Sequence, residues 1–295
     1  MAEKLGFIGL GVMGGHMARH LSEAQKVIVF DIDPEKKTAI RSAEKAASIQ
    51  EVGTAASIVF LSLPSSDVVR DVVLGTEGLI GVLDSGAAVI DLSTTEPTIS
   101  QEIATALRDR NVDFLDAPVS GGEGAAKDAS LAIMAGGPED VFARFKPFLE
   151  IVGKSVVRVG DSGMGGVAKL VNNMIVGATF SVVAEGFALG MKSGIDPQVL
   201  YDAIRGGWAG SNVLDVAAPG IINRDFKPGG SIDILFKDIG YALSLARSQN
   251  VPVPMTAMAD EIFKAARASG RGPFAQQIIV EMWEELLGID PDKKS

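Results

Sequence analysis

The residues best suited to chemistry are one lysine and two asparagines that follow a glycine-rich turn. The turn covers residues 160–166, and Lys169, Asn172 and Asn173 begin an apolar run that continues to about Met191. Because Lys169 and Asn173 are four residues apart, both side chains would project from one face of a helix. Burial and the positive end of that helix both favour a neutral amine, which suits proton transfer. The alternative is a solvated surface lysine, which is the commoner use of this residue type.

Composition removes several other kinds of chemistry. The 295-residue chain has no cysteine, which excludes disulfides, thiolate nucleophiles and cysteine zinc sites. Its two histidines, His16 and His20, stand four apart on an expected helix, but no carboxylate motif accompanies them, so we predict no metal site. The net charge of −10 argues against nucleic acid and anionic membrane surfaces as partners. An acid/base group in this chain is therefore not expected to be a histidine.

A glycine motif near the N-terminus predicts a dinucleotide site. The apolar run 5–8 is typical of a buried parallel strand, and it leads into a G-x-G-x-x-G turn and a helix. The first glycine allows the tight turn, the second lets backbone N–H groups approach a pyrophosphate, and the third lets the helix pack against the strand. The residues of this motif are Gly9, Leu10, Gly11, Val12, Met13 and Gly14.

Asp31 follows a second apolar strand, 27–30, and stands 22 residues beyond Gly9. An acidic side chain at this point can bind both ribose hydroxyls of an adenosine and would repel a 2′-phosphate. This arrangement favours NAD over NADP as the cofactor. A turn or cap residue before Pro34 is the alternative interpretation of Asp31.

Strand and helix patterns alternate through the rest of the first half. Further strands are predicted at 58–64, 88–92, 112–116, 131–135 and 156–159, with helices between most of them. This pattern indicates a doubly wound sheet, whose ligands bind outside the carboxyl ends of the strands. By that rule Leu63, Pro64 and Thr95 line the dinucleotide cleft, unless they are ordinary loop residues.

Ser120, Gly121 and Gly122 follow the strand that ends at Asp116. A serine hydroxyl and two glycine N–H groups can form a nest that holds a carboxylate. A flexible loop is the commoner use of Ser-Gly-Gly.

Strand signals fade in the second half of the chain, and its pattern predicts helices. We therefore expect a dinucleotide-binding domain of residues 1–163 and an all-helical domain of residues 164–295. The apolar stretch 170–189 is interrupted by Asn172, Asn173 and Glu185, which favours a buried interdomain helix over a membrane span.

Lys237 and Asp238 form either an exposed pair of opposite charge, or they place a second amine at the active-site cleft. Trp208 either covers the pocket or packs in the core. The expected helices are 166–191, 197–204, 211–222, 232–248, 255–268 and 275–287.

Together these motifs resemble the β-hydroxyacid dehydrogenase family. The motifs that carry the resemblance stand in the family's order at residues 6–14, 116–122, 160–173 and 237–238. The resemblance implies an α/β fold, with an N-terminal Rossmann dinucleotide-binding domain and a C-terminal all-α domain joined by a long helix. It also implies a homodimer or homotetramer.

The resemblance also implies roles for individual residues. Lys169 looks like the catalytic lysine, and Lys237 looks like the lysine near the nicotinamide and the substrate. Ser120, Gly121, Gly122 and Asn173 look like substrate-binding residues, while Leu63, Pro64 and Thr95 look like cofactor contacts. Asp31 matches the members that use NAD.

The implied reaction is the NAD(H)-dependent interconversion of a small β-hydroxy acid and its semialdehyde, with a carboxylate on the substrate. The segment 204–211, together with residues 214–215 and 225–229, looks most like tartronate semialdehyde reductases, although Trp208 replaces a smaller residue and would narrow or reshape the pocket. Other candidate substrates are 3-hydroxyisobutyrate, 4-hydroxybutyrate and sulfolactaldehyde.

Two rival readings come from outside that reaction. One is a non-catalytic NAD-binding protein, since fold does not determine function. The other is an imine reductase, in which another residue typically replaces the lysine. No signal-peptide pattern precedes the strand at residues 5–8, so we expect a cytoplasmic protein.

Overall fold

The computed structural model of the chain describes residues 4–227 and 229–290. It divides into two compact units, Met1–Lys169 and Leu170–Ser295. The expected boundary at 163/164 coincides with the start of the long helix at Met164, whereas the first unit continues to Lys169. The division at 163/164 stays a prediction. The opening residues Met1–Glu3, on which the expected location partly rests, lie outside the described residues.

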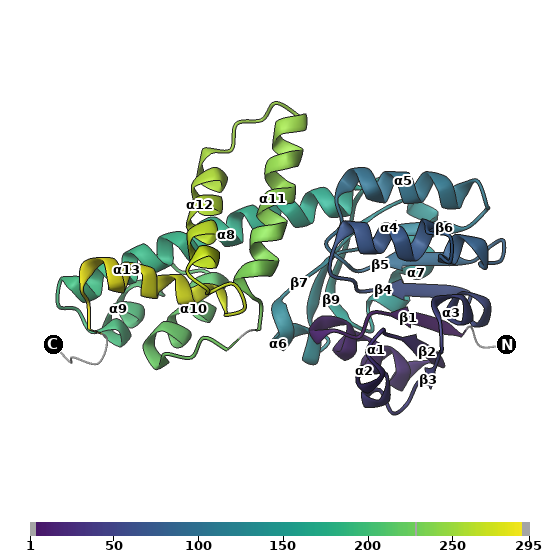
Figure 1. The fold of residues 1–295 in the computed structure, drawn as a ribbon, viewed down its shortest axis with the longest axis horizontal. Coiled ribbons are helices and arrows are strands. Elements are labelled where there is room, and N and C mark those ends of the chain that lie inside the picture. Colours follow the sequence, from purple (N-terminus) through teal and green to yellow (C-terminus); the bar gives the residue numbers. More distant parts are fainter. Residues whose placement is uncertain (1–3, 228, 291–295) are drawn as a thin grey trace. The chain divides into compact units, whose positions relative to one another are not determined.

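The first unit is built around one mixed sheet (Figure 1). Its order is β3-β2-β1-β4-β5-β6-β8-β7, with β9 paired to β8. The pairs from β3 to β6 are parallel, while β8 runs antiparallel to β6 and β7. The strands are β1 (Leu5–Ile8), β2 (Val27–Phe30), β3 (Glu44–Lys45), β4 (Ile58–Leu61), β5 (Ala88–Asp91), β6 (Asp113–Asp116), β7 (Val119–Ser120), β8 (Leu131–Gly136) and β9 (Gly153–Gly160).

Helices cover both faces of this sheet, as the doubly wound pattern predicts. The helices are α1 (Val12–Ala24), α2 (Pro34–Ala39), α3 (Ile49–Ala55), α4 (Ser66–Leu74), the 3-10 turn η1 (Leu79–Gly81), α5 (Pro97–Arg108), α6 (Gly122–Lys127) and α7 (Glu139–Leu149).

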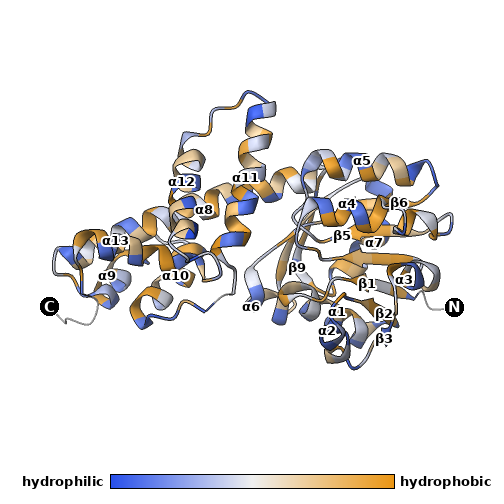
Figure 2. Cartoon of the chain, in the orientation of Figure 1, coloured by the Kyte–Doolittle hydropathy of each residue, from blue (hydrophilic) through white to orange (hydrophobic). Residues whose placement is uncertain are grey.

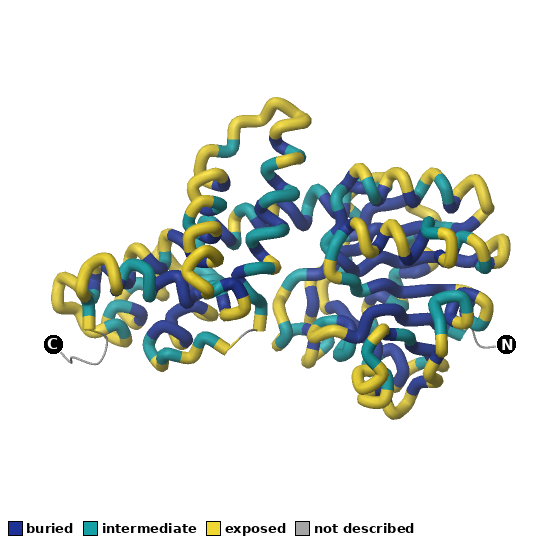
Figure 3. Tube along the Cα trace, viewed as in Figure 1, coloured by how far each residue is buried: buried dark blue, intermediate teal, exposed yellow. Residues whose placement is uncertain are grey.

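Two core layers form because successive strand residues point to opposite faces. Phe7 and Phe60 lie in one cluster, with stacked rings whose centroids are 6.2 Å apart. Ile8 and Leu61, the next residues along the same strands, lie in the other cluster. The central strands are accordingly apolar (Figure 2) and buried (Figure 3).

The second unit is helical around its own core, which includes Phe180, Phe187 and Phe263. An α/β unit and an all-α unit, carried by one chain with a long helix, confirm the predicted fold class. The predicted helix 275–287 is in fact a 3-10 turn followed by a helix. The elements are α8 (Met164–Lys192), α9 (Pro197–Ile204), α10 (Asn212–Asn223), α11 (Ile232–Ser248), α12 (Pro254–Ala268), η2 (Gln276–Ile279) and α13 (Val280–Leu287).

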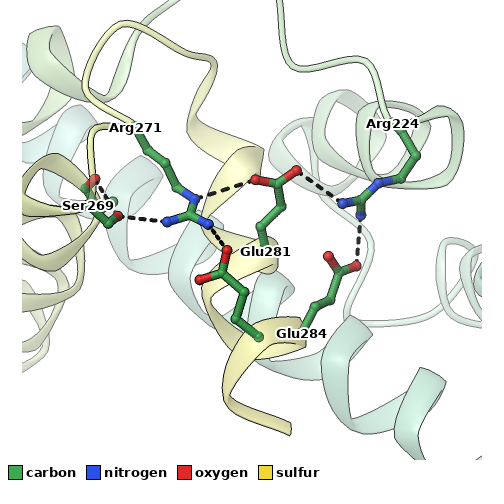
Figure 4. Close-up of polar contacts among 7 residues, drawn as sticks. Arg224, Ser269, Arg271, Glu281 and Glu284 are labelled. Carbon is green, nitrogen blue, oxygen red and sulfur yellow. Dashed lines mark hydrogen bonds and ion pairs between the residues drawn. The ribbon is translucent and has the colours of Figure 1, made fainter. Parts of the chain in front are cut away.

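A network of ion pairs connects α13 to the rest of this unit (Figure 4). Arg224, at the end of α10, donates to Glu281 at 3.1 Å and to the buried Glu284 at 2.7 Å. Arg271, in the turn after α12, donates to Glu281, Glu285 and Ser269. Glu281 is shared by both arginines, so the network links the ends of α10 and α12 to α13.

Helix α8 is long and apolar enough to cross a membrane by length and composition alone. Its most apolar 18-residue window has a mean hydropathy of 1.6 and is 39% buried. The expectation of a buried helix therefore holds only for part of its surface, because Val171, Ile175, Val182 and Leu189 are exposed.

Candidate active site

The glycine loop has the geometry that a phosphate needs. Gly9 has a φ of +93°, and a Cβ there would lie 2.3 Å from the Ser62 carbonyl oxygen. A Cβ on Gly14 would lie 2.1 Å from the Gly9 carbonyl oxygen, so both positions are restricted to glycine by close packing. A Cβ on Gly11 would meet nothing within 4 Å, and no side chain caps α1 at this residue. The loop therefore leaves open backbone at the helix N-terminus, which fits a dinucleotide pyrophosphate.

Asp31 is held beside this loop at the end of β2. Its carboxylate accepts hydrogen bonds from the Leu10 N–H at 2.6 Å and the Asp33 N–H at 2.8 Å. The second bond is the turn contact of the alternative interpretation, but the cap of α2 is Asp33 itself, which accepts from the Glu35 N–H. The structure thus places Asp31 next to the glycine motif, and its role toward a ribose stays a prediction.

The buried carboxylate of Asp91 organises the ends of β4 and β5. It accepts from the Ser93 N–H at 3.0 Å and from the Thr95 hydroxyl at 2.6 Å. The Ser93 hydroxyl in turn accepts from the Leu63 N–H at 2.8 Å, so two predicted cofactor contacts belong to one network. Burial raises the pKa of Asp91 to about 6, although the hydrogen bonds from Ser93 and Thr95 oppose that shift. Pro64 is exposed next to this network.

Sequence reasoning missed Asp91. The available signal was a carboxylate that directly ends an apolar strand and precedes Ser93 and Thr95.

Ser120, Gly121 and Gly122 form a junction between a short strand and a short helix. Ser120 ends β7, which pairs with β8, and Gly122 begins α6. Gly121 and Gly122 have φ values of +132° and +69°, which explains why glycine occupies both positions. The segment is therefore a defined turn between regular elements rather than an irregular loop. Its role in binding a carboxylate stays a prediction.

The two histidines belong to the contact between α1 and α6. His16 lies 3.6 Å from Glu123, and the His20 ring lies 2.9 Å from the Lys127 carbonyl oxygen. Within residues 4–227 and 229–290, no group of three or more His, Asp or Glu side chains is arranged to hold a metal ion.

The start of α8 packs on the carboxyl ends of β6 and β8. Asp116, at the end of β6, is 1% exposed and accepts from the Gly163 N–H at 2.7 Å and the Gly166 N–H at 3.0 Å. A Cβ on Gly165 would lie 2.3 Å from the Asp116 carbonyl oxygen and 2.4 Å from that of Met134. The glycines of the 160–166 turn thus permit a close approach of helix and sheet. Sequence reasoning did not identify Asp116 as a functional residue.

Burial dominates the electrostatics of Asp116. Loss of solvation raises the pKa of its carboxyl to about 6, and the nearby charge of Asp91 adds to the rise. The hydrogen bonds from Gly163 and Gly166 act in the opposite direction.

Lys169 and Asn173 are one turn apart on α8 and both are buried, with 9% and 5% of their surfaces exposed. The interpretation of Lys169 as a solvated surface lysine is therefore wrong. Asn173 donates to the Asp238 carboxylate at 2.6 Å and accepts from the Asn172 amide at 2.9 Å.

Asp238 joins α8 to α11 within the second unit. It is 2% exposed, and its other oxygen accepts from Lys237 at 2.7 Å. Lys237 lies over the ring of Tyr241, 4.6 Å from its centroid. The interpretation of Lys237 and Asp238 as an exposed pair is wrong, because the carboxylate is buried and connects the lysine to Asn173.

Trp208 lies between α9 and α10 and is fully exposed. The interpretation of Trp208 as a core residue is therefore wrong. A contact between its ring and a substrate stays a prediction.

Comparisons with known proteins cover nearly the whole chain. Residues 4–160 match the family profile described as the NAD binding domain of 6-phosphogluconate dehydrogenase. Residues 163–283 match the profile described as NAD-binding of NADP-dependent 3-hydroxyisobutyrate dehydrogenase. Helix α8 lies within the second match, which identifies it as part of a dehydrogenase domain rather than a membrane anchor.

Individual relatives agree with these profiles. The chain is 35% identical to 2-(hydroxymethyl)glutarate dehydrogenase of Eubacterium barkeri, over 97% of this chain and 96% of the relative. It is also 35% identical to 2-hydroxy-3-oxopropionate reductase of Escherichia coli, over 95% and 97% of the two chains. The solved structure of a 3-hydroxyisobutyrate dehydrogenase of Mycobacterium tuberculosis, with L-serine, has a TM-score of 0.86 at 29% identity and covers 96% and 99%.

Proposed function

The chain belongs to the 3-hydroxyisobutyrate dehydrogenase-like branch of the β-hydroxyacid dehydrogenases, and from that premise we propose that it interconverts tartronate semialdehyde and glycerate with NAD(H). The family makes it an NAD(P)-dependent oxidoreductase of small hydroxy acids. The observation that carries the proposal is a buried amine, Lys169, near the N-terminus of α8 and one turn before the buried amide of Asn173.

Lys169 is proposed as the proton-transfer residue. The nicotinamide coenzyme, when bound, gives or accepts the hydride. During reduction the Lys169 ammonium donates a proton to the carbonyl oxygen as that oxygen gains charge, and during oxidation the neutral amine removes the hydroxyl proton. Asn173, fixed by its hydrogen bond to Asp238, holds the substrate oxygen in register with the amine. Ser120, Gly121 and Gly122 hold the substrate carboxylate, while Lys237 adds a second positive charge.

The test replaces Lys169 by alanine. Proton transfer from a placed group contributes about 10²–10⁴ in rate, so Lys169→Ala should lower kcat by that factor. NADH binding should change less than about twofold, because the glycine loop and Asp31 are intact. Turnover is followed by NADH absorbance, and binding by NADH fluorescence. Lys154→Ala is the matched control, because Lys154 is an exposed lysine on β9 of the same unit.

The outcomes separate the candidate functions. Restoration of part of the lost rate by ethylamine would identify the missing group as an amine. If Lys169→Ala retained full turnover, the proton-transfer role would be wrong. Tight NADH binding by the wild-type protein, with no activity on any substrate, would support the non-catalytic NAD-binding protein instead.

The choice of substrate is tested with a panel of small acids. We expect the highest kcat/KM for tartronate semialdehyde, on the resemblance of residues 204–211 and the 35% identity to the Escherichia coli reductase. The panel also contains 3-hydroxyisobutyrate, 4-hydroxybutyrate, sulfolactaldehyde and, from the Eubacterium relative, 2-(hydroxymethyl)glutarate. A preference of tenfold or more for another member would replace tartronate semialdehyde in the proposal. Trp208→Ala should change the order of preference if the ring contacts the substrate.

NAD is proposed as the preferred coenzyme, with NADP less favoured. A carboxylate beside the ribose repels a 2′-phosphate, and like-charge contacts of this kind cost several kcal/mol. Asp31→Ala should therefore raise the NADPH/NADH ratio of kcat/KM about 10²-fold. An unchanged ratio would remove Asp31 from the ribose site. The Asp33→Ala variant controls for the adjacent negative charge and for the start of α2.

We also propose a cytoplasmic homodimer or homotetramer, with neither nucleic acid nor membrane as a partner. The exposed apolar residues of α8, Val171, Ile175, Val182 and Leu189, support self-association, because contiguous apolar surface on a helix favours burial against a partner. Light scattering coupled to gel filtration measures the mass. A monomer at micromolar concentration would contradict the assembly.

A further inference from the structure

The carboxylate of Asp116 occupies the position of a helix cap, although it comes from a strand far away in the sequence. We infer that Asp116 is a positioning residue that sets the location of Lys169 by capping the N-terminus of α8. The inference rests on the proposed role of Lys169. It concerns a group that touches the start of the helix rather than the substrate.

The contacts are those of an N-cap. The first N–H groups of a helix have no partner within the helix, and a side-chain oxygen normally comes from the residue just before it. Here that residue is Gly163, which has no side chain. Asp116, which is 47 and 50 residues earlier, supplies one oxygen to Gly163 and the other to Gly166. Each oxygen therefore holds a different amide of the first turn.

The surrounding glycines allow the start of α8 to pack closely against the sheet. A Cβ on Gly136 would lie 2.6 Å from one Asp116 carboxylate oxygen and 2.7 Å from the Gly165 nitrogen. A Cβ on Gly165 would likewise lie close to the carbonyl oxygens of Asp116 and Met134 and 2.9 Å from an Asp116 carboxylate oxygen, so backbone and carboxylate contacts together hold the first turn. Lys169 is three residues beyond Gly166, which is less than one helical turn. A displacement of the first turn would therefore be carried directly to its amine.

The chemistry of the cap indicates a purpose other than stability. A buried carboxylate is costly to desolvate, and burial raises the pKa of Asp116 although the hydrogen bonds from Gly163 and Gly166 lower it. A carboxylate does, however, accept two backbone N–H groups at once from fixed directions. Placement of the helix start is the property that this side chain provides.

The test is Asp116→Asn, which keeps the shape but has only one oxygen. One of the two amides then faces an NH2 group and loses its acceptor, because a backbone N–H cannot reverse its role. We expect kcat to fall about 10- to 100-fold, as small misplacements of reacting groups do, while the substrate KM and the NADH Kd change less than about threefold. Asp196→Ala is the matched control. It removes the cap of α9, where Asp196 accepts from Gln198 and Val199, and should leave kcat unchanged.

A double variant distinguishes positioning from general damage. If Asp116 acts through Lys169, then Asp116→Asn should cause less than a twofold further loss in the Lys169→Ala protein, measured on its residual turnover. Amide exchange of the 160–170 segment should rise in Asp116→Asn. Multiplicative losses in the double variant, or a full kcat in Asp116→Asn while Lys169→Ala is inactive, would overturn this inference alone. Full turnover of Lys169→Ala would instead overturn the proposed function.

Discussion

Asp91 and Asp116 are two buried carboxylates at equivalent positions of neighbouring strands, but they bind different parts of the chain. They are the last residues of the parallel strands β5 and β6, and they are partners in the register of that pair. Both are buried, and burial raises the pKa of each to about 6. Asp91 binds its own following loop through Ser93 and Thr95, whereas Asp116 binds the start of a helix about 50 residues later.

The difference lies in the donors. One of the groups bound to Asp91 is a hydroxyl, which can donate or accept, so the site tolerates a change in the protonation or type of its side chain. Both groups bound to Asp116 are backbone N–H groups, which only donate. The first site orders a local loop, and the second fixes a distant helix with no freedom to rearrange.

The largest effect should come from adding one carbon at the Asp116 site. Gly165→Ala places a Cβ against two backbone oxygens, so the helix start must move, with an expected loss of about 3 kcal/mol in the free energy of unfolding and a fall in kcat. Gly186→Ala, also on α8 but with open space around its Cβ, should stabilise by about 0.5–1 kcal/mol. Urea denaturation measures both. Equal effects would mean that the contact of helix and sheet is loose.

A smaller effect should appear in the pH dependence of stability. Because the folded-state pKa of each carboxyl is about 6 and the unfolded value is 3.8, the folded protein binds these protons more tightly. Their contribution to stability is therefore full below about pH 4 and is lost as pH rises through about 6. The Asp91→Asn variant has no carboxyl to titrate at this position, so its free energy of unfolding should fall less than that of the wild type as pH rises. Between pH 4 and 7.5 the difference should change in favour of the variant by an amount on the order of 2 kcal/mol.

The same titration in Asp116→Asn sharpens the comparison. The stability of Asp116→Asn should also depend less on pH than that of the wild type, but it should lie about 1–3 kcal/mol below that of Asp91→Asn at every pH, because one buried N–H has no acceptor. Denaturation in urea at several values between pH 4 and 7.5 gives both curves. Wild-type and Asp91→Asn curves that ran parallel would show that the carboxyl of Asp91 does not titrate in this range.

The smallest effect should come from removing the Thr95 hydroxyl that donates to Asp91. Thr95→Val removes the donor to Asp91 with little change in volume, and should lower the free energy of unfolding at pH 7.5 by about 1–2 kcal/mol. Thr95→Ser keeps the hydroxyl and should be close to wild type. If serine and valine were equally destabilising, packing of the threonine methyl would matter more than the hydrogen bond.

Much of the fold could be predicted from the sequence because its signals are local. Short apolar runs identified β1, β4 and β5, the first of them helped by the glycine turn that follows it, and Gly/Pro loops separated the helices of the second unit. The glycine roles were also local, because a turn that needs positive φ selects its own residue, as at Gly9. The short elements β7 and α6 were missed, since two-residue pairing depends on a neighbouring strand.

The functional carboxylates were harder to find for a physical reason. Asp116 and Asp238 accept hydrogen bonds from amides 50 and 65 residues away, and nothing in the neighbouring residues indicates which amides these are. Lys169 could be singled out because its charge contrasts with an apolar run. Asp238 appeared only as the neighbour of Lys237, and Trp208 gave no sign of whether its ring was inside or outside.

The complete exposure of Trp208 makes it an optical reporter. The chain has only one other tryptophan, Trp283, whose indole nitrogen is buried in the second unit. A solvated indole emits at longer wavelength than a buried one, so the two rings give separable fluorescence. Ligand that covers the loop between α9 and α10 would shift the red component alone, and Trp208→Phe would leave a clean spectroscopic probe of unfolding at α13.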